Sequence, residues 1–160
     1  MKKIIPFIIS FLAVILGCQH ASSQTTSEGA ATGSKYLPLE RVTTDYMKKL
    51  VDPYASNINL TGKPLVVLTS TKACRVGLFA SDYLQRYFLK HNPNATFVEY
   101  RVDDDWNTVW YKDFCKRAQF EGDSVPYIIF INPEGRTKFV RGFRKDQPED
   151  VDRLLNEFLK

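Results

Sequence analysis

The sequence contains few of the residues that mark common catalytic and metal sites. Of its 160 residues, three are cysteine and two are histidine. No set of cysteines and histidines has the spacing of a zinc site, and the sequence has no glycine-rich phosphate loop. Because His91 is the only histidine after residue 35, no serine–histidine–aspartate set can be assembled in the expected folded part. The sequence therefore predicts neither a metal nor a cofactor.

The sequence also lacks an excess of charge of one sign. Its 22 lysines and arginines stand against 18 acidic residues, and the basic residues are scattered, often beside acids. Two of the basic residues, Lys2 and Lys3, lie in a segment that we expect to be removed. A nucleic-acid surface needs clustered basic residues, so no nucleic-acid partner is expected. A hydrophobic content of 44% is enough for the core of one domain.

The start of the chain has the pattern of a secretory signal peptide. Two lysines precede an apolar run from Ile4 to Leu16, which is shorter than the roughly 20 apolar residues of a spanning helix. The run ends in "ILGC" and resembles a bacterial lipobox, although Leu16 is larger than the usual residue there. The resemblance implies cleavage before Cys18 and a diacylglycerol on its sulfur. The alternative is ordinary cleavage after Ser23, which would remove Cys18.

A polar spacer follows the predicted cleavage site. Residues 18–35 are mostly small and polar, which predicts a flexible tether between a lipid anchor and a domain. In enterobacterial-type sorting, aspartate after the lipidated cysteine retains a lipoprotein at the inner membrane, so Gln19 favours the outer membrane. We therefore expect a signal peptide over 1–17, a tether over 18–35 and a folded domain over 36–160, lipid-anchored on the periplasmic side of a bacterial cell envelope.

The hydrophobic pattern of the folded part predicts a succession of helices and strands. Runs bounded by proline or serine indicate buried strands, and the turn "NPEG" indicates a hairpin between the last two strands. A strand–helix–strand unit makes parallel neighbours, so we expect an α/β domain with a four-stranded mixed sheet flanked by helices and an extra N-terminal helix. The predicted helices are 39–52, 74–91, 103–120 and 148–158, and the predicted strands are 63–70, 95–102, 125–132 and 136–142.

This order of elements resembles the thioredoxin-like fold over about residues 60 to 160. Cys74, in "KPLVVLTSTKAC", stands at the turn from strand to helix where that family carries its active cysteine. "SVP" and "NPEGRTKFVRGF" resemble the stretch that carries its cis-proline, hairpin and terminal glycine. The resemblance implies that the cis-proline loop faces Cys74 and that Val125 and Pro126 pair, through their backbone, with a bound peptide.

The expected surroundings of Cys74 favour its reactive form. A helix N-terminus carries a partial positive charge of about half a unit, and Lys72 and Arg75 add positive charge nearby. Positive surroundings stabilise the thiolate, which is the nucleophile in disulfide chemistry.

The chain departs from the thioredoxin pattern in three places. Gly77 stands where the family has its second, resolving cysteine, and Ala73 stands where the family usually has tryptophan. Leu68 stands where thioredoxins often carry a buried acid. Because a resolving thiol releases the substrate from a mixed disulfide, these departures argue against an ordinary dithiol reductase.

Two interpretations of Cys74 follow. In the first, the chain is an exported, membrane-anchored protein whose single Cys74 exchanges disulfides with a cysteine-containing protein or peptide, or with a small thiol. In the second, the chain is a non-catalytic binding module of the cell envelope that retains the same groove. Whether it is an enzyme stays open. A third interpretation, glutathione or iron–sulfur handling as in monothiol glutaredoxins, fits Lys72 but not the "RVG" that follows Cys74.

Three further features have structural explanations. Cys115 lies beside the expected packing face of helix 103–120, so we expect burial, whereas a resolving role would require its Cα to lie within about 7 Å of that of Cys74. The run Asp103–Asp105 is expected to cap that helix, because no spaced set of oxygen ligands follows. The expected packing faces of the two long helices include these residues: Val76, Phe79, Ala80, Tyr83, Leu84, Tyr87 and Phe88 in the first, and Trp106, Val109, Trp110 and Phe114 in the second.

Overall fold

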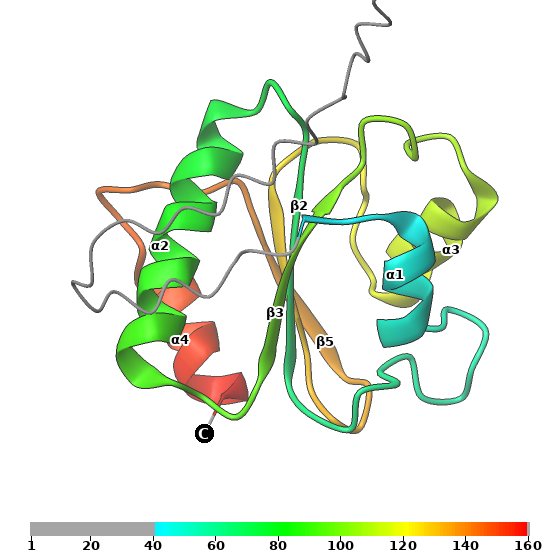
Figure 1. The fold of residues 1–160 in the computed structure, drawn as a ribbon, viewed down its shortest axis with the longest axis horizontal. Helices are drawn as coiled ribbons and strands as arrows, with labels where there is room; N and C mark the ends of the chain where they lie inside the picture. The colour runs from blue at the N-terminus through cyan, green and yellow to red at the C-terminus, as the bar shows by residue number, and fades with distance from the viewer. Residues whose placement is uncertain (1–40, 160) are drawn as a thin grey trace, which may run out of the picture. The chain divides into compact units, whose positions relative to one another are not determined.

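The computed structural model describes residues 41–159, which form a mixed sheet of five strands with four helices (Figure 1). The predicted signal peptide (1–17), Cys18 and the tether (18–35) lie outside the described residues, as do residues 36–40 of the predicted domain. The elements in chain order are β1 Arg41–Val42, α1 Thr44–Leu50, β2 Leu65–Ser70, α2 Arg75–His91, β3 Thr96–Arg101, α3 Val109–Arg117, β4 Tyr127–Ile131, β5 Thr137–Arg141 and α4 Glu149–Phe158.

The sheet has the strand order β1-β3-β2-β4-β5. Strand β2 is parallel to β3 and antiparallel to β4, and β4 forms a hairpin with β5. These four strands are the predicted four-stranded mixed sheet. The two-residue β1, parallel to β3, is an addition that the sequence did not predict. It lies inside the helix expected over 39–52, which begins only at Thr44, after the Thr43 side chain has accepted a hydrogen bond from the N–H of Tyr46.

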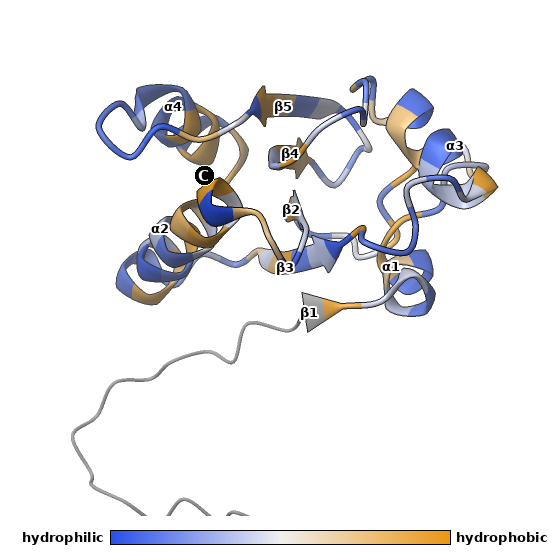
Figure 2. Cartoon of the chain, turned by 90° about the horizontal axis from the view of Figure 1, so that it is seen from above, coloured by the Kyte–Doolittle hydropathy of each residue, from blue (hydrophilic) through white to orange (hydrophobic). Residues whose placement is uncertain are grey.

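Two helices cover each face of the sheet. Figures 1 and 2 show α2 and α4 on one face and α1 and α3 on the other. Alternate residues of β2 enter the two cores, with Val66 and Leu68 toward α2 and α4, and Leu65 and Val67 toward α1 and α3. Because both faces are covered, β2 and β4 are buried along their whole length, which explains their continuous apolar runs. Within residues 41–159, no helix has the length and apolar character needed to cross a membrane.

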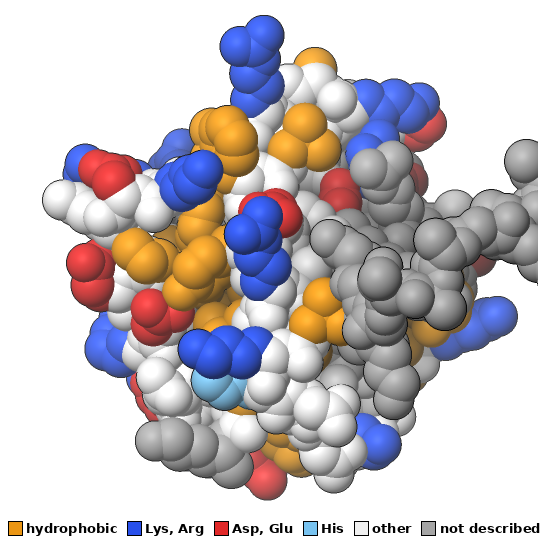
Figure 3. All heavy atoms as spheres, turned by 60° about the vertical axis from the view of Figure 1, so that its left-hand side comes forward, with side chains coloured by type: hydrophobic (Ala, Val, Ile, Leu, Met, Phe, Trp, Pro, Cys, Tyr) orange, Lys and Arg blue, Asp and Glu red, His pale blue; other side chains and the backbone are white. Residues whose placement is uncertain are grey.

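The face that α2 buries differs from the predicted one. The helix packs through a narrow stripe of mostly small residues: Gly77, Ala80, Ser81, Leu84 and Phe88. Val76 and Phe79, predicted to pack, are instead 39% and 52% exposed, because they lie beside this stripe rather than on it. Figure 3 shows the resulting strip of apolar side chains on the α2 side of the molecule.

Helix α3 is shorter than predicted. It begins at Val109, which is 72% exposed rather than part of the core, and the Thr108 side chain caps its N-terminus by accepting from the N–H of Tyr111. The acidic run Asp103–Asp105 precedes the helix in a turn and does not cap it. The tyrosine hydroxyl of Tyr100 donates to Asp105 at 3.0 Å, so this acid ties the turn to the core.

Candidate functional site

Cys74 is the N-cap residue of α2, as the sequence predicted. Its Sγ accepts a hydrogen bond from the N–H of Gly77 at 3.2 Å, and its own N–H donates to the carbonyl of Thr71 at 3.1 Å. The side chain is half-buried rather than sealed in the core. The sulfur therefore lies at the positive end of the helix, in contact with a helical N–H, and it is accessible from solvent.

The loop that presents Cys74 is held by the turn after β3. The N–H of Lys72 donates to the two carboxylate oxygens of Asp103 at 3.0 and 3.3 Å, and the N–H of Val102 donates to the carbonyl of Ser70 at 3.0 Å. Asp103 was predicted to cap a helix, and it fixes this loop instead. The side chains of Lys72 and Arg75 are exposed, and neither forms an ion pair within the part of the chain that the structure describes.

The predicted proline loop lies at the same end of the sheet. The peptide bond between Val125 and Pro126 is cis, as predicted. Pro126 directly precedes β4, whose first residue Tyr127 pairs with Thr69 near the end of β2, with a 3.0 Å bond from the Tyr127 N–H to the Thr69 hydroxyl. The N–H of Gly142 donates to the Pro126 carbonyl at 2.8 Å. The sheet thus brings Cys74 and the cis-proline to the same end of its strands.

The backbone of Val125 has no hydrogen-bond partner among residues 41–159. Its side chain is half-buried against the core on the α1 and α3 side, which holds the residue in place. An extended segment laid along residues 124 and 125 would find a free N–H and a free carbonyl there, which is the requirement for backbone pairing.

Cys115 lies in α3, away from Cys74. Helices α2 and α3 cover opposite faces of the sheet, and both cysteines are free thiols. Cys115 is buried, as predicted, and a Cβ added to Gly122 would lie 2.3 Å from its Sγ, so the chain before the cis-proline covers it closely. This burial raises the pKa of Cys115 to about 11. The structure therefore gives no support to a resolving role for this thiol.

A buried carboxylate near Cys74 was missed in the sequence. Glu99 on β3 is 1% exposed, and it accepts from the hydroxyl of Ser70 at 2.6 Å and from that of Ser81 at 3.2 Å. The guanidinium Nε of Arg101 lies 3.4 Å from the same carboxylate. The alternation of β3 carried the signal, because Glu99 shares a face with the apolar Phe97 and that face points toward α2.

This carboxylate is connected to the Cys74 site through Ser70 and Gly77. A Cβ built on Gly77 would lie 3.0 Å from the Cβ of Ser70 and 3.3 Å from the Sγ of Cys74. Glu99 is also the register partner of Leu68, the residue at the position where an acid was expected and not found. The site therefore has a buried acid after all, on the neighbouring strand.

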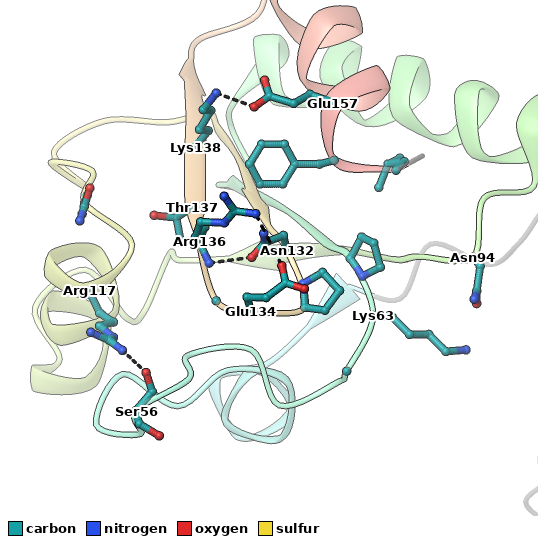
Figure 4. A pocket seen from close by; sticks show the side chains of 17 residues that line it. Ser56, Lys63, Asn94, Arg117, Asn132, Glu134, Arg136, Thr137, Lys138 and Glu157 are labelled. Atoms are coloured by element: carbon teal, nitrogen blue, oxygen red, sulfur yellow. Dashed lines mark hydrogen bonds and ion pairs between the residues drawn. The ribbon is translucent and has the colours of Figure 1, made fainter.

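A further hollow lies at the opposite end of the sheet from Cys74. It has a volume of about 1050 Å³ and is lined by the hairpin at 132–138 and the end of α4 (Figure 4). Several of its charged side chains bind within the chain: Lys138 pairs with Glu157 at 2.6 Å, and Arg117 donates to the carbonyl of Ser56 at the same distance. Among residues 41–159, no group of three acidic, histidine or cysteine side chains is arranged to hold a metal ion.

Comparison with known proteins supports the fold. No protein-family model matches the chain, and no curated protein sequence matches it significantly. Among solved structures, the chain is similar to mitochondrial thioredoxin 3 from Saccharomyces cerevisiae in its oxidized form, with 14% identity over 78% of this chain and 99% of that one and a TM-score of 0.51. It is also similar to chloroplastic thioredoxin z, with 12% identity over 75% and 93% of the two chains and a TM-score of 0.53.

A third similar structure comes from work on the thiol-resolving mechanism of yeast mitochondrial 1-Cys peroxiredoxin via glutathione/thioredoxin systems. Its identity is 15%, over 78% of this chain and 99% of that chain, and its TM-score is 0.50. At such identities the similarity establishes the architecture alone. The chain has a thioredoxin-like fold, the fold used by thiol redox proteins. Cys74 and Pro126 lie at the same end of its sheet.

Proposed function

We propose that this chain takes part in thiol–disulfide exchange through a single nucleophile, Cys74. The observation that carries the proposal is the position of this sulfur. It is half-buried, accepts a hydrogen bond from the N–H of Gly77, and lies at the N-terminus of α2, close in sequence to Lys72 and Arg75, which form no ion pair among residues 41–159. The residue is only half-buried, which leaves it open to a second sulfur.

The chemical step involves one disulfide of a partner. The Cys74 thiolate attacks one sulfur of that disulfide, a new sulfur–sulfur bond forms, and the other sulfur leaves with the bonding electrons as a thiolate that takes a proton from water. Gly77 supplies no thiol one turn along α2, and Cys115 is buried in α3, on the opposite face of the sheet. The mixed disulfide therefore persists until an external small thiol attacks it, which makes the chemistry monothiol.

The partner is a cysteine-containing protein or peptide, or a small thiol. Two observations favour a peptide. The free backbone of Val125 offers a donor and an acceptor beside Pro126, and the apolar strip on α2 adjoins the Cys74 loop. A bound extended segment would pair with Val125 while its cysteine meets Cys74.

A second candidate function uses the same surface without chemistry. Gly77 in place of a resolving cysteine favours a binding module of the cell envelope, in which Cys74 is only the N-cap of α2. The free backbone of Val125 serves this function equally well. The two candidates differ in one property, namely covalent bond formation at Cys74.

We further propose that the chain acts in a bacterial cell envelope, anchored through a lipid on Cys18 and facing the periplasm, on the outer rather than the inner membrane. The "ILGC" end of the apolar run and Gln19 support this placement. The test is fractionation of cells that produce the full chain. The Cys18→Ala variant should leave the membrane fraction, and a variant that stays membrane-bound would contradict the anchor.

The test of the thiol chemistry is adduct formation with oxidised glutathione. Incubation of the full chain should yield one glutathione adduct by mass spectrometry, and tryptic mapping should place it on Cys74. The Cys74→Ser variant should form none, whereas Cys115→Ser should react like the parent. If oxidised glutathione forms no adduct with Cys74, thiol–disulfide exchange is excluded and the binding module is the function that stands.

A further inference from the structure

The first turns of α2 expose an apolar surface beside the reactive sulfur. Val76, Leu78 and Phe79 are 39%, 49% and 52% exposed, within five positions of Cys74. Figure 3 shows the apolar strip to which this turn contributes. Val76 and Phe79 lie one turn apart on the same side of the helix, whereas Leu78 lies on another side. We call Val76 and Phe79, together with Lys145, the α2 patch. Because folded domains rarely group large apolar side chains at the surface without a use, this patch indicates a contact surface.

Cations frame this patch. The ammonium group of Lys145, in the loop between β5 and α4, lies 5.7 Å from the centre of the Phe79 ring. Arg75 lies one turn before Phe79 on α2 and forms no ion pair within the described residues, and the first turn of α2 contains no acid. Two acids on α2 and on the loop that carries Lys145 are paired with neighbouring arginines, Asp82 with Arg86 at 3.0 Å and Asp146 with Arg144 at 3.4 Å. The net charge offered by the patch is positive.

The opposite side of the Cys74 loop has the opposite charge. A hollow of about 430 Å³ on this side is lined by four aspartates, Asp45 and the run at 103–105, and by two cations, Lys72 and Arg101, so the acids of its lining outnumber the cations. Asp103 there holds the Lys72 backbone. An acidic segment would be repelled on this side and attracted on the α2 side, so the charge pattern around Cys74 has a direction.

We propose that the α2 patch recognises an acidic and apolar stretch of polypeptide next to the target cysteine of a partner. This inference rests on the proposed function for the presence of a target cysteine, and it adds the chemistry that selects the partner. Apolar side chains of the partner cover Val76 and Phe79, while its carboxylates lie against Lys145 and Arg75. The acidic hollow excludes the reversed orientation.

The test measures rates with three peptides of one design. Each contains one cysteine, bonded as a disulfide to 2-nitro-5-thiobenzoate, beside one leucine and two variable positions that are both glutamate, both glutamine or both lysine. The Cys74 thiolate attacks the peptide sulfur, the thiobenzoate leaves with the electron pair, and its absorbance reports the rate. The protein is the full chain in non-ionic detergent, with Cys18→Ala and Cys115→Ala, so that Cys74 is its only thiol.

The glutamate peptide should react about tenfold faster than the lysine peptide at low salt, with glutamine between them. The ratio should approach one at about 1 M salt, where the screening length is about 3 Å. Lys145→Glu should remove most of the preference, and Phe79→Ser should slow all three peptides. Val109→Ser and Lys112→Glu are equivalent changes on the exposed side of α3. They should change neither the preference for glutamate nor the rates.

The outcomes separate the two proposals. If Cys74 fails to react even with the small disulfide 5,5′-dithiobis(2-nitrobenzoate), the thiol chemistry of the proposed function is wrong. The patch is then tested alone, by fluorescence anisotropy of the labelled glutamate and lysine peptides on the Cys74→Ser chain, where preference for glutamate supports it. Equal rates for the three peptides on a chain whose Cys74 does react would overturn the patch and leave the proposed function standing.

Discussion

Glu99 provides the sharpest test of how the Cys74 end of the sheet is held together. Its carboxylate, 1% exposed, accepts from the hydroxyls of Ser70 and Ser81 and lies 3.4 Å from Arg101. The Glu99→Ala variant leaves these buried donors without their acceptor. A hydrogen bond to a charged group contributes about 1.5–3 kcal/mol, and removing one partner of a buried pair costs about 3–5 kcal/mol. We expect a loss of about 3–5 kcal/mol, a large part of a typical domain stability of about 5–15 kcal/mol.

The assay is urea unfolding followed by circular dichroism, with Asp82→Ala as the matched control. Asp82 pairs with Arg86 at 3.0 Å on the surface, where such a pair contributes at most about 1 kcal/mol. A second variant, Glu99→Leu with Ser70→Ala and Ser81→Ala, removes the acceptor and two donors together and should recover most of the lost stability. If Glu99→Ala lowers the free energy of unfolding no more than Asp82→Ala does, Glu99 does not hold this end of the sheet together. A triple variant as unstable as the single one would lead to the same conclusion.

The remaining predictions concern Gly77, Gly122 and Cys115. The parent chain should show little turnover in an insulin-reduction assay, and Gly77→Cys should raise it by about tenfold or more by supplying a resolving thiol, whereas Gly77→Ala, which crowds Ser70 equally, should not. Gly122→Ala should cost about 2–4 kcal/mol in urea unfolding, because Gly122 has φ +67° and the added Cβ would lie 2.3 Å from the Sγ of Cys115; Gly142→Ala, at φ +74° with nothing within 4 Å, should cost only about 1 kcal/mol. Burial raises the pKa of Cys115 from 9.0 to about 11, so as the pH rises the unfolded chain loses this proton before the folded chain does. The contribution of the buried thiol to stability is therefore complete below pH 9 and is lost as the pH rises to 11. Over that range the free energy of unfolding of the parent should fall by about 2–3 kcal/mol more than that of Cys115→Ala. An equal loss in both chains would contradict the burial of this thiol.

The sheet and the hairpin could be predicted because their signals are local. Strands β2 and β4 are continuous apolar runs, and Gly135 in "NPEG" adopts the positive φ of 80° that the hairpin turn requires. The position of Cys74 at the start of α2 follows from the same patterns. Strand β1 could not be predicted, because two residues carry too little pattern and Val42 also fits a helical spacing.

The charged and exposed parts of the site depend on tertiary structure, and there the sequence was less informative. Helical spacing identified α2 but not which side of its first turn faces the sheet, so Phe79 was expected inside and lies outside. Asp103 was expected to cap a helix and holds the Lys72 loop instead, because that contact joins residues 31 positions apart. Glu99 was missed for the same reason, since its partners come from two other elements.

Covalent trapping in intact cells tests whether Cys74 forms mixed disulfides with partner polypeptides. Cells that produce the full chain with Cys115→Ala are quenched with N-ethylmaleimide and compared, on non-reducing gels and by mass spectrometry, with cells that also carry Cys74→Ser. We expect adducts with partner polypeptides that are sensitive to reductant and that form only when Cys74 is present. Adducts that persist in the Cys74→Ser chain, or a Cys74 chain that forms none, would contradict this expectation.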